Sequence, residues 1–247
     1  MVGVKSLGKT VLHATGLFPI VRAAARKLDR SLQADLRTDY DLYSKFISPG
    51  DLVFDIGVNL GQKSAVFLNC GAKVIGAEPN PLCRPTLKYE FGNNPNFSLV
   101  AAAVGSAQSE MELNFSGTSS TASLRQDWRW VGIEGEPQKT LVQVTTLDAL
   151  IDQYGLPTFC KIDVEGFEDE VLRGLSRPLK CVSFEYHIDE PERLTFCLNH
   201  LSGLSPIWIN AIDMNTGNFI FERWTDAVDY ERLPPAGDMF VVTEDLN

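Results

Sequence analysis

Short apolar runs alternate with amphipathic segments along most of the chain. Runs such as 52–57 and 159–164 have the length of buried strands, and the segments between runs carry apolar residues at helical spacing. This alternation is typical of an α/β fold in which a mostly parallel sheet has helices on both faces. The predicted strands are 52–57, 73–77, 97–104, 111–115, 140–144, 159–164, 180–186, 207–213, 219–223 and 239–243, and the predicted helices are 20–30, 35–47, 65–70, 81–91, 147–154 (with Thr146 as its N-cap), 168–175 and 190–202.

The same pattern predicts the domain organisation. Neither a repeat nor a linker interrupts it, so we expect a helical leader over residues 1–38 and one domain over residues 39–247. Residues 116–139 are polar and rich in Ser, Thr and Gly, and they separate two predicted strands. Because long loops inside compact domains are often functional, we expect this segment to be a lid or a substrate loop.

The formal net charge of the 247 residues is −10, and it is unevenly distributed. Residues 1–38 carry seven basic and two acidic side chains, whereas the remainder is strongly acidic. An acidic surface repels phosphate groups, so the composition excludes a protein that binds the backbone of nucleic acids. For the basic leader we expect an amphipathic helix that lies on the domain or makes weak contact with an anionic membrane surface.

Cysteine usage and the length of the apolar runs bear on location. The five cysteines include no C-x-x-C pair, and Cys160 and Cys181 lie in apolar runs where small hydrophobic residues are expected. His13, Gly16 and Pro19 interrupt the apolar stretch of the leader, which argues against a signal peptide, and every apolar run is too short to span a membrane. We therefore expect a reducing compartment and a cytoplasmic location.

A glycine-rich turn follows the predicted strand at 52–57. Residues 55–61 read Asp-Ile-Gly-Val-Asn-Leu-Gly and open the next helix, and Glu78 follows the next strand. Glycines in such a turn let backbone amides approach a ligand closely, and a carboxylate after the second strand is placed to bind ribose hydroxyls. The turn and Glu78 together predict a cofactor that contains a nucleoside, the alternative being a turn that binds no ligand.

The charge of the turn favours one cofactor class over another. Asp55 at the strand end would repel the pyrophosphate of a dinucleotide, and Asn59 stands where a dinucleotide fingerprint has its second glycine. S-adenosylmethionine (SAM) carries no phosphate, and its ammonium and sulfonium groups are attracted to a carboxylate. The residues therefore favour SAM over a dinucleotide.

Four sequence blocks resemble those of a known family. They are Val53-Phe-Asp-Ile-Gly-Val-Asn-Leu-Gly61, Gly76-Ala-Glu-Pro-Asn80, Val144-Thr-Thr-Leu-Asp148 and Lys161-Ile-Asp-Val-Glu-Gly-Phe-Glu168. In order and spacing, over roughly residues 50–190, they resemble the FkbM family of SAM-dependent methyltransferases. Members usually have Ala where this chain has Val58 and His or Tyr near Phe167, and neither difference removes a polar group.

The resemblance implies a class I methyltransferase fold of the Rossmann-like type. Its sheet would have seven strands in the order 3-2-1-4-5-7-6, extended here by the N-terminal helices. The implied cofactor is SAM, with S-adenosylhomocysteine (SAH) as product, and the implied reaction is O-methylation of a sugar or natural-product hydroxyl. Carried over by position, the implied cofactor residues are Asp55, Gly57, Asn59 and Gly61 around the methionine part, Glu78 at the ribose, Pro79 and Asn80 near the nucleoside, Ala103 and Val104 at the adenine, and Asp163 of the fourth block.

Two pairs of ionisable residues end neighbouring predicted strands. Asp163 and Glu165 end one strand, Glu185 and His187 end the next, and residues two apart on a strand share a face. Transfer to a hydroxyl needs a base within hydrogen-bond distance, so His187 is the natural candidate, with Asp163, Glu165 or Glu185 orienting it or acting in its place. These residues also have structural interpretations: Asp163 and Glu165 could interact with the next helix, and His187 could be structural. A further alternative, less favoured than these, is that the groups bind a divalent cation.

The predicted lid contains candidate substrate contacts. They are Ser120, Arg125, Trp128 and Trp130, although the tryptophans could instead pack beneath the loop. The sequence therefore predicts a SAM-dependent O-methyltransferase acting on a sugar, a glycan or a related natural product. The alternatives are a SAM- or glycan-binding domain without catalysis and, less favoured, a dinucleotide-dependent oxidoreductase.

Overall fold

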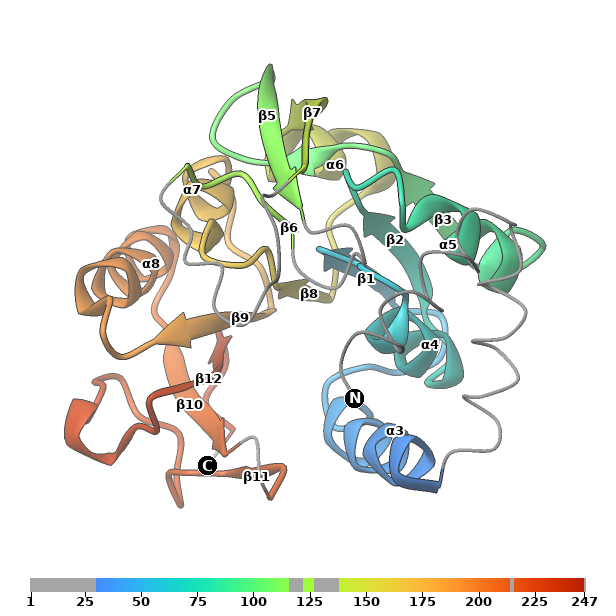
Figure 1. Ribbon diagram of the computed structural model, residues 1–247. Coiled ribbons are helices and arrows are strands. Elements are labelled where there is room, and N and C mark those ends of the chain that lie inside the picture. Colours follow the sequence, from blue (N-terminus) through green and yellow to red (C-terminus); the bar gives the residue numbers. More distant parts are fainter. Residues whose placement is uncertain (1–29, 116–121, 127–137, 214–215, 247) are drawn as a thin grey trace, which may run out of the picture.

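The computed structural model describes residues 30–115, 122–126, 138–213 and 216–246. Within this part of the chain, a central sheet of eight strands carries helices on both faces (Figure 1). The strands of the central sheet are β1 (Leu52–Ile56), β2 (Lys73–Ala77), β3 (Phe97–Val100), β8 (Phe159–Ile162), β9 (Cys181–His187), β10 (Trp208–Asp213), β11 (Asn218–Phe219) and β12 (Ala236–Val242). The helices are α3 (Arg30–Tyr43), α4 (Gln62–Asn69), α5 (Arg84–Phe91), α6 (Leu147–Tyr154), α7 (Glu168–Arg173), α8 (Pro191–Leu204) and the short 3-10 helix η1 (Tyr230–Arg232).

The strands follow the order β11-β10-β12-β9-β8-β1-β2-β3 across the central sheet. The central strand β1 pairs in parallel with β2 and β8, while β12 runs antiparallel between β9 and β10. The predicted α/β class is confirmed. The predicted seven-stranded count and order are corrected by the edge strand β11, which pairs antiparallel with β10 at Ile212 and Asp213.

β11 is also shorter than the predicted strand at 219–223. Beyond Phe219, the side-chain amide of Asn210 takes the place of a neighbouring strand: its Nδ2 donates to the carbonyl of Phe221 at 2.9 Å, and its Oδ1 accepts from the Phe221 N–H at 3.1 Å. Because this amide satisfies the backbone groups of Phe221, the chain can leave the sheet there.

A second sheet of four described strands lies beside the first. It consists of β4 (Ala103–Val104), β5 (Ser109–Phe115), β6 (Ala122–Ser123) and β7 (Gln138–Thr145) in the order β4-β7-β5-β6. The single strand predicted at 97–104 is therefore two strands in two sheets: β3 pairs with β2, and β4 pairs with β7. The second sheet has its own apolar cluster, which includes Leu113, Phe115 and Val142.

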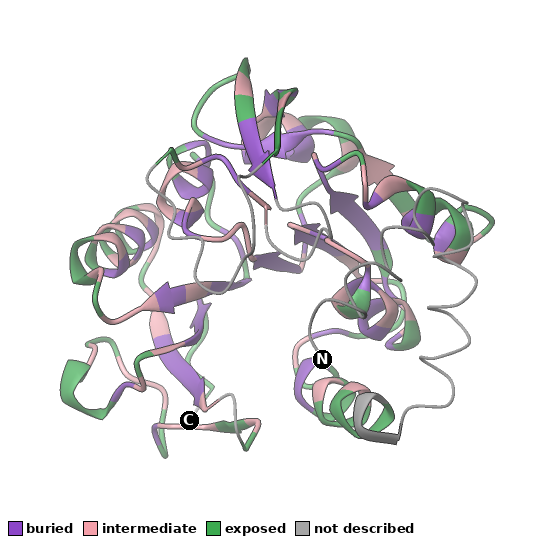
Figure 2. Ribbon diagram, in the orientation of Figure 1, coloured by how far each residue is buried: buried purple, intermediate pink, exposed green. Residues whose placement is uncertain are grey.

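Alternation along the strands directs side chains to two main clusters. In Figure 2 the buried residues lie mainly along the strands of the central sheet. Phe54 and Ile56 of β1 face the cluster under α6, α7 and α8, whereas Val53 faces the cluster under α3 and α4. Tyr43 of α3 packs edge-on against Phe67 of α4, with 5.0 Å between ring centroids. This packing fixes α3 against the sheet near the carboxyl end of β1.

The helical leader lies mostly outside the described residues, and so does the helix predicted at 20–30. α3 runs across the predicted boundary at residue 38, so the division into leader and domain stays a prediction. In the part of the chain that the structure describes, no helix combines the length and apolar character needed to cross a membrane. The segment 116–139 is not a loop throughout, because Ala122–Ser123 pairs with β5 and β7 already begins at Gln138.

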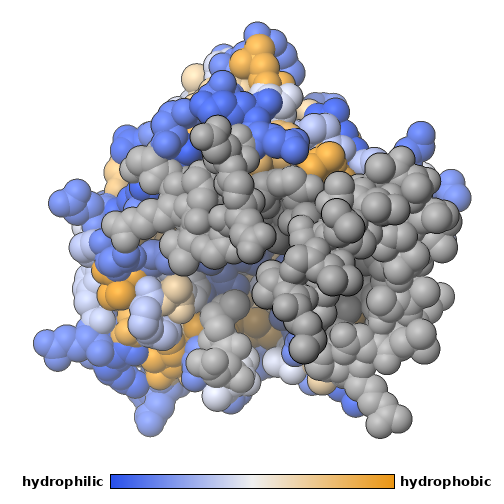
Figure 3. Space-filling view, viewed as in Figure 1, coloured by the Kyte–Doolittle hydropathy of each residue, from blue (hydrophilic) through white to orange (hydrophobic). Residues whose placement is uncertain are grey.

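The described surface exposes six large apolar side chains. Its exposed large apolar side chains come from separate segments, and on the face drawn in Figure 3 the apolar areas are divided by hydrophilic ones. These side chains are Tyr40, Tyr89, Leu141, Leu156, Tyr230 and Leu246.

Candidate active site

The turn after β1 brings a buried carboxylate and a close backbone contact to the sheet edge. Asp55 is 2% exposed and accepts a hydrogen bond of 2.5 Å from Ser64 Oγ, and burial raises its pKa to about 6. Gly57 has a φ of 88°, and a Cβ there would lie 1.8 Å from the carbonyl oxygen of Asp163. Glycine is therefore required where the turns after β1 and β8 meet.

Glu78 joins the turns after β1 and β2. One of its carboxylate oxygens accepts from the Asn59 N–H at 2.6 Å, and the other accepts from the Asn80 N–H at 2.7 Å. Burial raises the pKa of Glu78 to about 7. Each carboxylate oxygen keeps acceptor capacity after one such bond, so Glu78 can still bind ligand hydroxyls.

A first cleft opens along these turns and the second sheet. Asn80 is 1% exposed, its Oδ1 accepts from the Leu82 N–H at 3.0 Å, and its Nδ2 has no hydrogen-bond partner among the described residues. Buried polar groups are normally paired, so this amide is available to a ligand. Of the predicted cofactor residues, Gly57, Asn59, Glu78, Pro79, Asn80, Ala103, Val104 and Asp163 line the first cleft.

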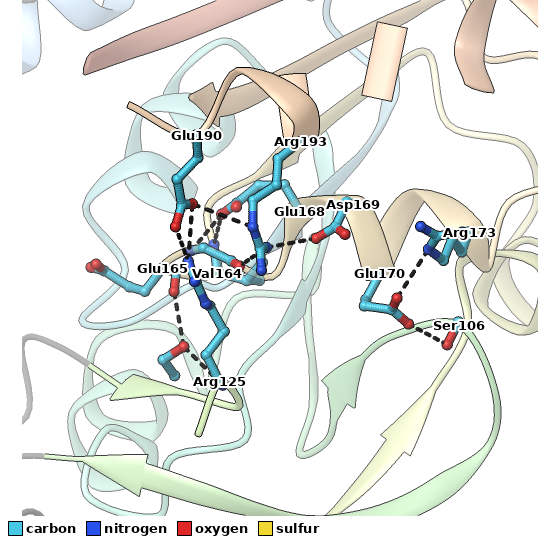
Figure 4. A network of polar contacts seen from close by, with 12 residues as sticks. Ser106, Arg125, Val164, Glu165, Glu168, Asp169, Glu170, Arg173, Glu190 and Arg193 are labelled. Carbon is cyan, nitrogen blue, oxygen red and sulfur yellow. Dashed lines mark hydrogen bonds and ion pairs between the residues drawn. The ribbon is translucent and has the colours of Figure 1, made fainter. Parts of the chain in front are cut away.

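The turn after β8 is held in a strained conformation. Glu165 has a φ of 57°, which non-glycine residues rarely adopt, and Gly166 follows with a φ of 87°. Glu168 Oε1 accepts from the N–H groups of Val164 and Gly166 at 3.1 and 3.2 Å. Ser123 Oγ donates to the Glu165 carbonyl at 2.8 Å (Figure 4). Such strain persists only where the surroundings fix the backbone.

Two arginines complete this network (Figure 4). The Arg125 guanidinium binds both carboxylate oxygens of Glu190, at 2.7 and 2.9 Å. Arg193 donates to the carbonyl of Gly166 and lies 2.8 Å from Asp169 Oδ1 and 3.3 Å from Glu190 Oε2. The network therefore ties β6, the turn after β8, α7 and α8 into one unit.

The four predicted catalytic residues are neighbours but do not all face one cavity. Asp163 and Glu165 line the first cleft, whereas Glu185 and His187 line a small recess beside Glu168. Burial, followed by the charges of Glu185 and Asp163, raises the pKa of Glu165 to about 8. Hydrogen bonding to Glu185 raises the pKa of His187 above its usual value.

A buried lysine and its partner are functional candidates that the sequence did not single out. Lys161 is 1% exposed, and its Nζ lies 3.0 Å from Asp238 Oδ1 and 3.4 Å from Asp163 Oδ2. Burial disfavours the charge of Lys161, but Asp163 and Asp238 outweigh this effect and raise its pKa. The sequence did contain a signal for this pair, namely one lysine inside the apolar run of β8. A buried charge requires a partner, so this lysine indicated an acidic residue nearby in the fold.

A second cleft of about 500 Å³ lies on the other side of the turn after β1. α3 contributes Asp39 and Tyr43 to its walls, and β12 contributes Asp238. It shares Gly57, Asn59 and Asp163 with the first cleft, so the two clefts meet at these residues. Asp55 lines the second cleft only, and Gly61, at the start of α4, lines neither.

The remaining sequence-based candidates have mixed outcomes. Arg125 is held by Glu190, and its role as a substrate contact stays a prediction. Ser120, Trp128 and Trp130 lie outside the described residues. Across the described ranges, no group of three or more His, Cys, Asp or Glu side chains is arranged to hold a metal ion.

Comparison with known proteins adds three similarities. The hexuronic acid methyltransferase AglP of Haloferax volcanii is 26% identical over 155 residues, which cover 61% of this chain and 62% of AglP, less than two thirds of its length. Two solved structures match at TM-scores of 0.45 and 0.40. The precorrin-6Y C5,15-methyltransferase of Geobacter metallireducens is 14% identical, and the match covers 88% of this chain and 93% of that one. A SAM-dependent O-methyltransferase of Thermotoga maritima is 13% identical, and the match covers 83% of this chain and 64% of that one.

The family itself is shown by a match to a family model. Residues 55–195 match the methyltransferase FkbM domain, and this range contains the turns after β1, β2 and β8. The match confirms the resemblance carried by the four sequence blocks. Since it spans more than half of the chain, the chain belongs to the FkbM methyltransferase family.

Proposed function

We propose that this protein is a SAM-dependent methyltransferase that methylates a hydroxyl group of a sugar, a glycan or a related natural product. The observation that carries the proposal is the meeting of two clefts at Asp163. One cleft offers the groups that a nucleoside needs, and the other leaves room for an acceptor beside it. Membership of the FkbM family and the name of the relative AglP support a methyl transfer and a sugar acceptor.

The residues of the first cleft fit the nucleoside part of SAM. Glu78 has acceptor capacity for ribose hydroxyls, and the unpaired Nδ2 of Asn80 can donate to a ligand. Ala103 and Val104 offer a buried apolar wall to the adenine. Asp55, Gly57 and Asn59 continue into the second cleft, where a carboxylate favours the ammonium group of the methionine part. When bound, SAM supplies the methyl group and a sulfonium leaving group.

Asp163 is the best-placed candidate for the base. Its carboxylate lies where the clefts meet, and burial and the charges of Glu185 and Asp238 raise its pKa, which strengthens it as a proton acceptor. In the proposed reaction this carboxylate takes the proton of the acceptor hydroxyl. The oxygen keeps the electron pair with which it bonds to carbon. Lys161 lies 3.4 Å from the Asp163 carboxylate. The remaining candidates are Glu165, which also lines the first cleft, and Glu185 and His187, which line the neighbouring recess.

Two measurements test the proposal. We expect SAH to raise the melting temperature and NADH to leave it unchanged, and Glu78→Gln to weaken SAH binding at least tenfold, because a ribose contact is lost. We also expect labelled methyl groups from SAM to appear on glycoside hydroxyls. No response to millimolar SAH contradicts the choice of cofactor. SAH binding without transfer to any hydroxylated acceptor supports a binding domain without catalysis.

A further inference from the structure

The second cleft has a strong excess of negative charge. Among the residues that the structure describes, its walls carry five carboxylates and one ammonium group, and Lys161 adds a second ammonium group next to Asp163 and Asp238. Lys63, the ammonium group on the wall, is already bound by Asp39 at 2.7 Å. The wall carboxylates are those of Asp35, Asp39, Asp55, Asp163 and Asp238.

A second, independent observation in this cleft also points to a ligand. Tyr43 lines the cleft and is completely buried, yet its hydroxyl has no hydrogen-bond partner among the described residues. Its ring is fixed by Phe67, Phe159 and Phe240. Buried hydroxyl groups are normally paired, and a phenol held beside carboxylates stays protonated and can donate. A ligand oxygen is the partner that such a hydroxyl lacks.

Resting on the proposed function, we propose that the second cleft binds the sugar acceptor and selects neutral or amino sugars over sugars that carry a carboxylate. The wall carboxylates accept hydrogen bonds from sugar hydroxyls, and Tyr43 donates one to a sugar oxygen. A cationic ammonium substituent is attracted by the cleft, whereas the carboxylate of a uronic acid is repelled by it.

The charge excess remains when the donor is present. SAM has two positive groups and one negative group, so it neutralises a single carboxylate. Once Lys63 and Lys161 are also counted, two of the five negative charges remain uncompensated when the acceptor binds. One unpaired carboxylate within a few ångströms of an anionic acceptor lowers its affinity by roughly tenfold in a partly hydrated site.

The inference is tested by sugar binding to the SAH-loaded protein, measured by calorimetry after SAH binding itself has been measured. The probes are the methyl glycosides of glucose, glucosamine and glucuronic acid. We expect the glucoside and the glucosaminide to bind, and the glucuronide to bind at least tenfold more weakly. The double variant Asp35→Asn, Asp39→Asn should shift the ratio of glucuronide to glucoside affinity by about tenfold towards the glucuronide. The control Asp152→Asn, Asp226→Asn removes two charges outside both clefts and should leave the ratio unchanged.

The variant Tyr43→Phe separates a ligand contact from a structural role. It removes only the unpaired hydroxyl, so the melting temperature of the free protein should stay the same or rise. SAH affinity should be unchanged, while affinity for the glucoside should fall about three- to tenfold.

Four results overturn the inference. They are a glucuronide that binds as tightly as the glucoside, no binding of any of the three glycosides to protein that binds SAH, Tyr43→Phe with unchanged sugar affinity, and Asp35→Asn, Asp39→Asn with an unchanged affinity ratio. If SAH itself does not bind, the proposed function fails and takes this inference with it. If SAH binds and the charge variants have no effect, only the inference fails.

Discussion

Lys161 of β8 and Asp238 of β12 form a buried ion pair with 3.0 Å between Nζ and Oδ1, although 77 residues separate them in sequence. β9 lies between β8 and β12 in the sheet, so the pair spans an intervening strand. Asp163 completes the group at 3.4 Å. The position of the candidate base therefore depends on the last strand of the chain.

Removing the lysine charge should destabilise the protein and change the titration of Asp163. We expect Lys161→Met to lower the free energy of unfolding by about 3–5 kcal/mol, because the buried carboxylate of Asp238 and the partly exposed carboxylate of Asp163 lose their counter-ion. The pKa of Asp163 should rise, which moves the acidic limb of the rate–pH profile to higher pH. Urea unfolding and the profile check these effects. The double variant Lys161→Met, Asp238→Asn should recover part of the lost stability, and a full additive loss contradicts the pairing.

The contact between Gly57 and Asp163 can be tested with a matched glycine. Gly57→Ala places a Cβ against the Asp163 carbonyl at a positive φ, so we expect a loss of several kcal/mol in stability and at least a hundredfold loss in SAH affinity. The control is Gly203→Ala in α8, where a Cβ meets no atom within 4 Å. It should leave SAH affinity unchanged and raise stability by up to about 1 kcal/mol. Equal effects at both positions would rule out the contact.

The strained backbone of Glu165 predicts an unusual order of stabilities. Glycine adopts the left-handed conformation without a steric penalty and alanine does not. We therefore expect Glu165→Gly to be more stable than Glu165→Ala by about 1 kcal/mol in urea unfolding. Glu165→Ala as the more stable of the two would contradict the observed φ.

Two roles of Arg125 can be distinguished by mutation: the substrate contact that the sequence predicts, and the structural role of its ion pair with Glu190. If the guanidinium only holds β6 against Glu190, Arg125→Met should lower kcat and stability, the latter by about 1–3 kcal/mol, while the acceptor KM stays constant. If Arg125 binds the substrate, KM rises instead. Steady-state kinetics at saturating SAM distinguish the two. Adding Glu190→Gln to Arg125→Met should cost only the remaining contact of Glu190 with Arg193, and so less than Glu190→Gln costs in the unaltered protein.

The raised carboxyl pKa values predict how stability varies with pH. Glu78, Glu165 and Glu168 have pKa values of about 7, 8 and 7, above the usual glutamate value of 4.5, with burial as the first cause. At pH values between the usual pKa of the unfolded chain and the raised pKa of the folded protein, the folded state binds more protons than the unfolded state. Stability should therefore fall as the pH rises from about 4.5 to about 8. Melting temperatures of the free protein check this slope, which Glu165→Gln should reduce. A protein that becomes more stable over this range contradicts the burial of these groups.

Local sequence signals predicted the parts of the fold that depend on near neighbours. The glycine turn at 55–61, the carboxylate Glu78 and the cap of α6 by Thr146, whose Oγ1 accepts from the Ala149 N–H at 3.1 Å, all lie within a few residues of the element that they shape. The match to the FkbM domain confirms the family that these signals indicated.

Features that depend on distant partners were missed. The apolar run at 97–104 looks continuous, but its two ends pair with different strands, and a run of apolar residues does not specify its partner. The second cleft likewise requires α3 and β12 to pack around the turn after β1. Tyr43 and Asp238 therefore carry no sequence signal for the site that they help to form.

The proposed reaction is a methyl transfer from SAM to a sugar hydroxyl with Asp163 as the base. Its most direct test is incubation of the protein with trideuteromethyl-labelled SAM and a panel of neutral and amino glycosides, followed by mass spectrometry and NMR of the products. We expect a labelled methyl group on a hydroxyl oxygen, and loss of this product in Asp163→Asn under conditions where SAH still binds. Label on nitrogen or on a carboxylate, or an unchanged rate in Asp163→Asn, would contradict it.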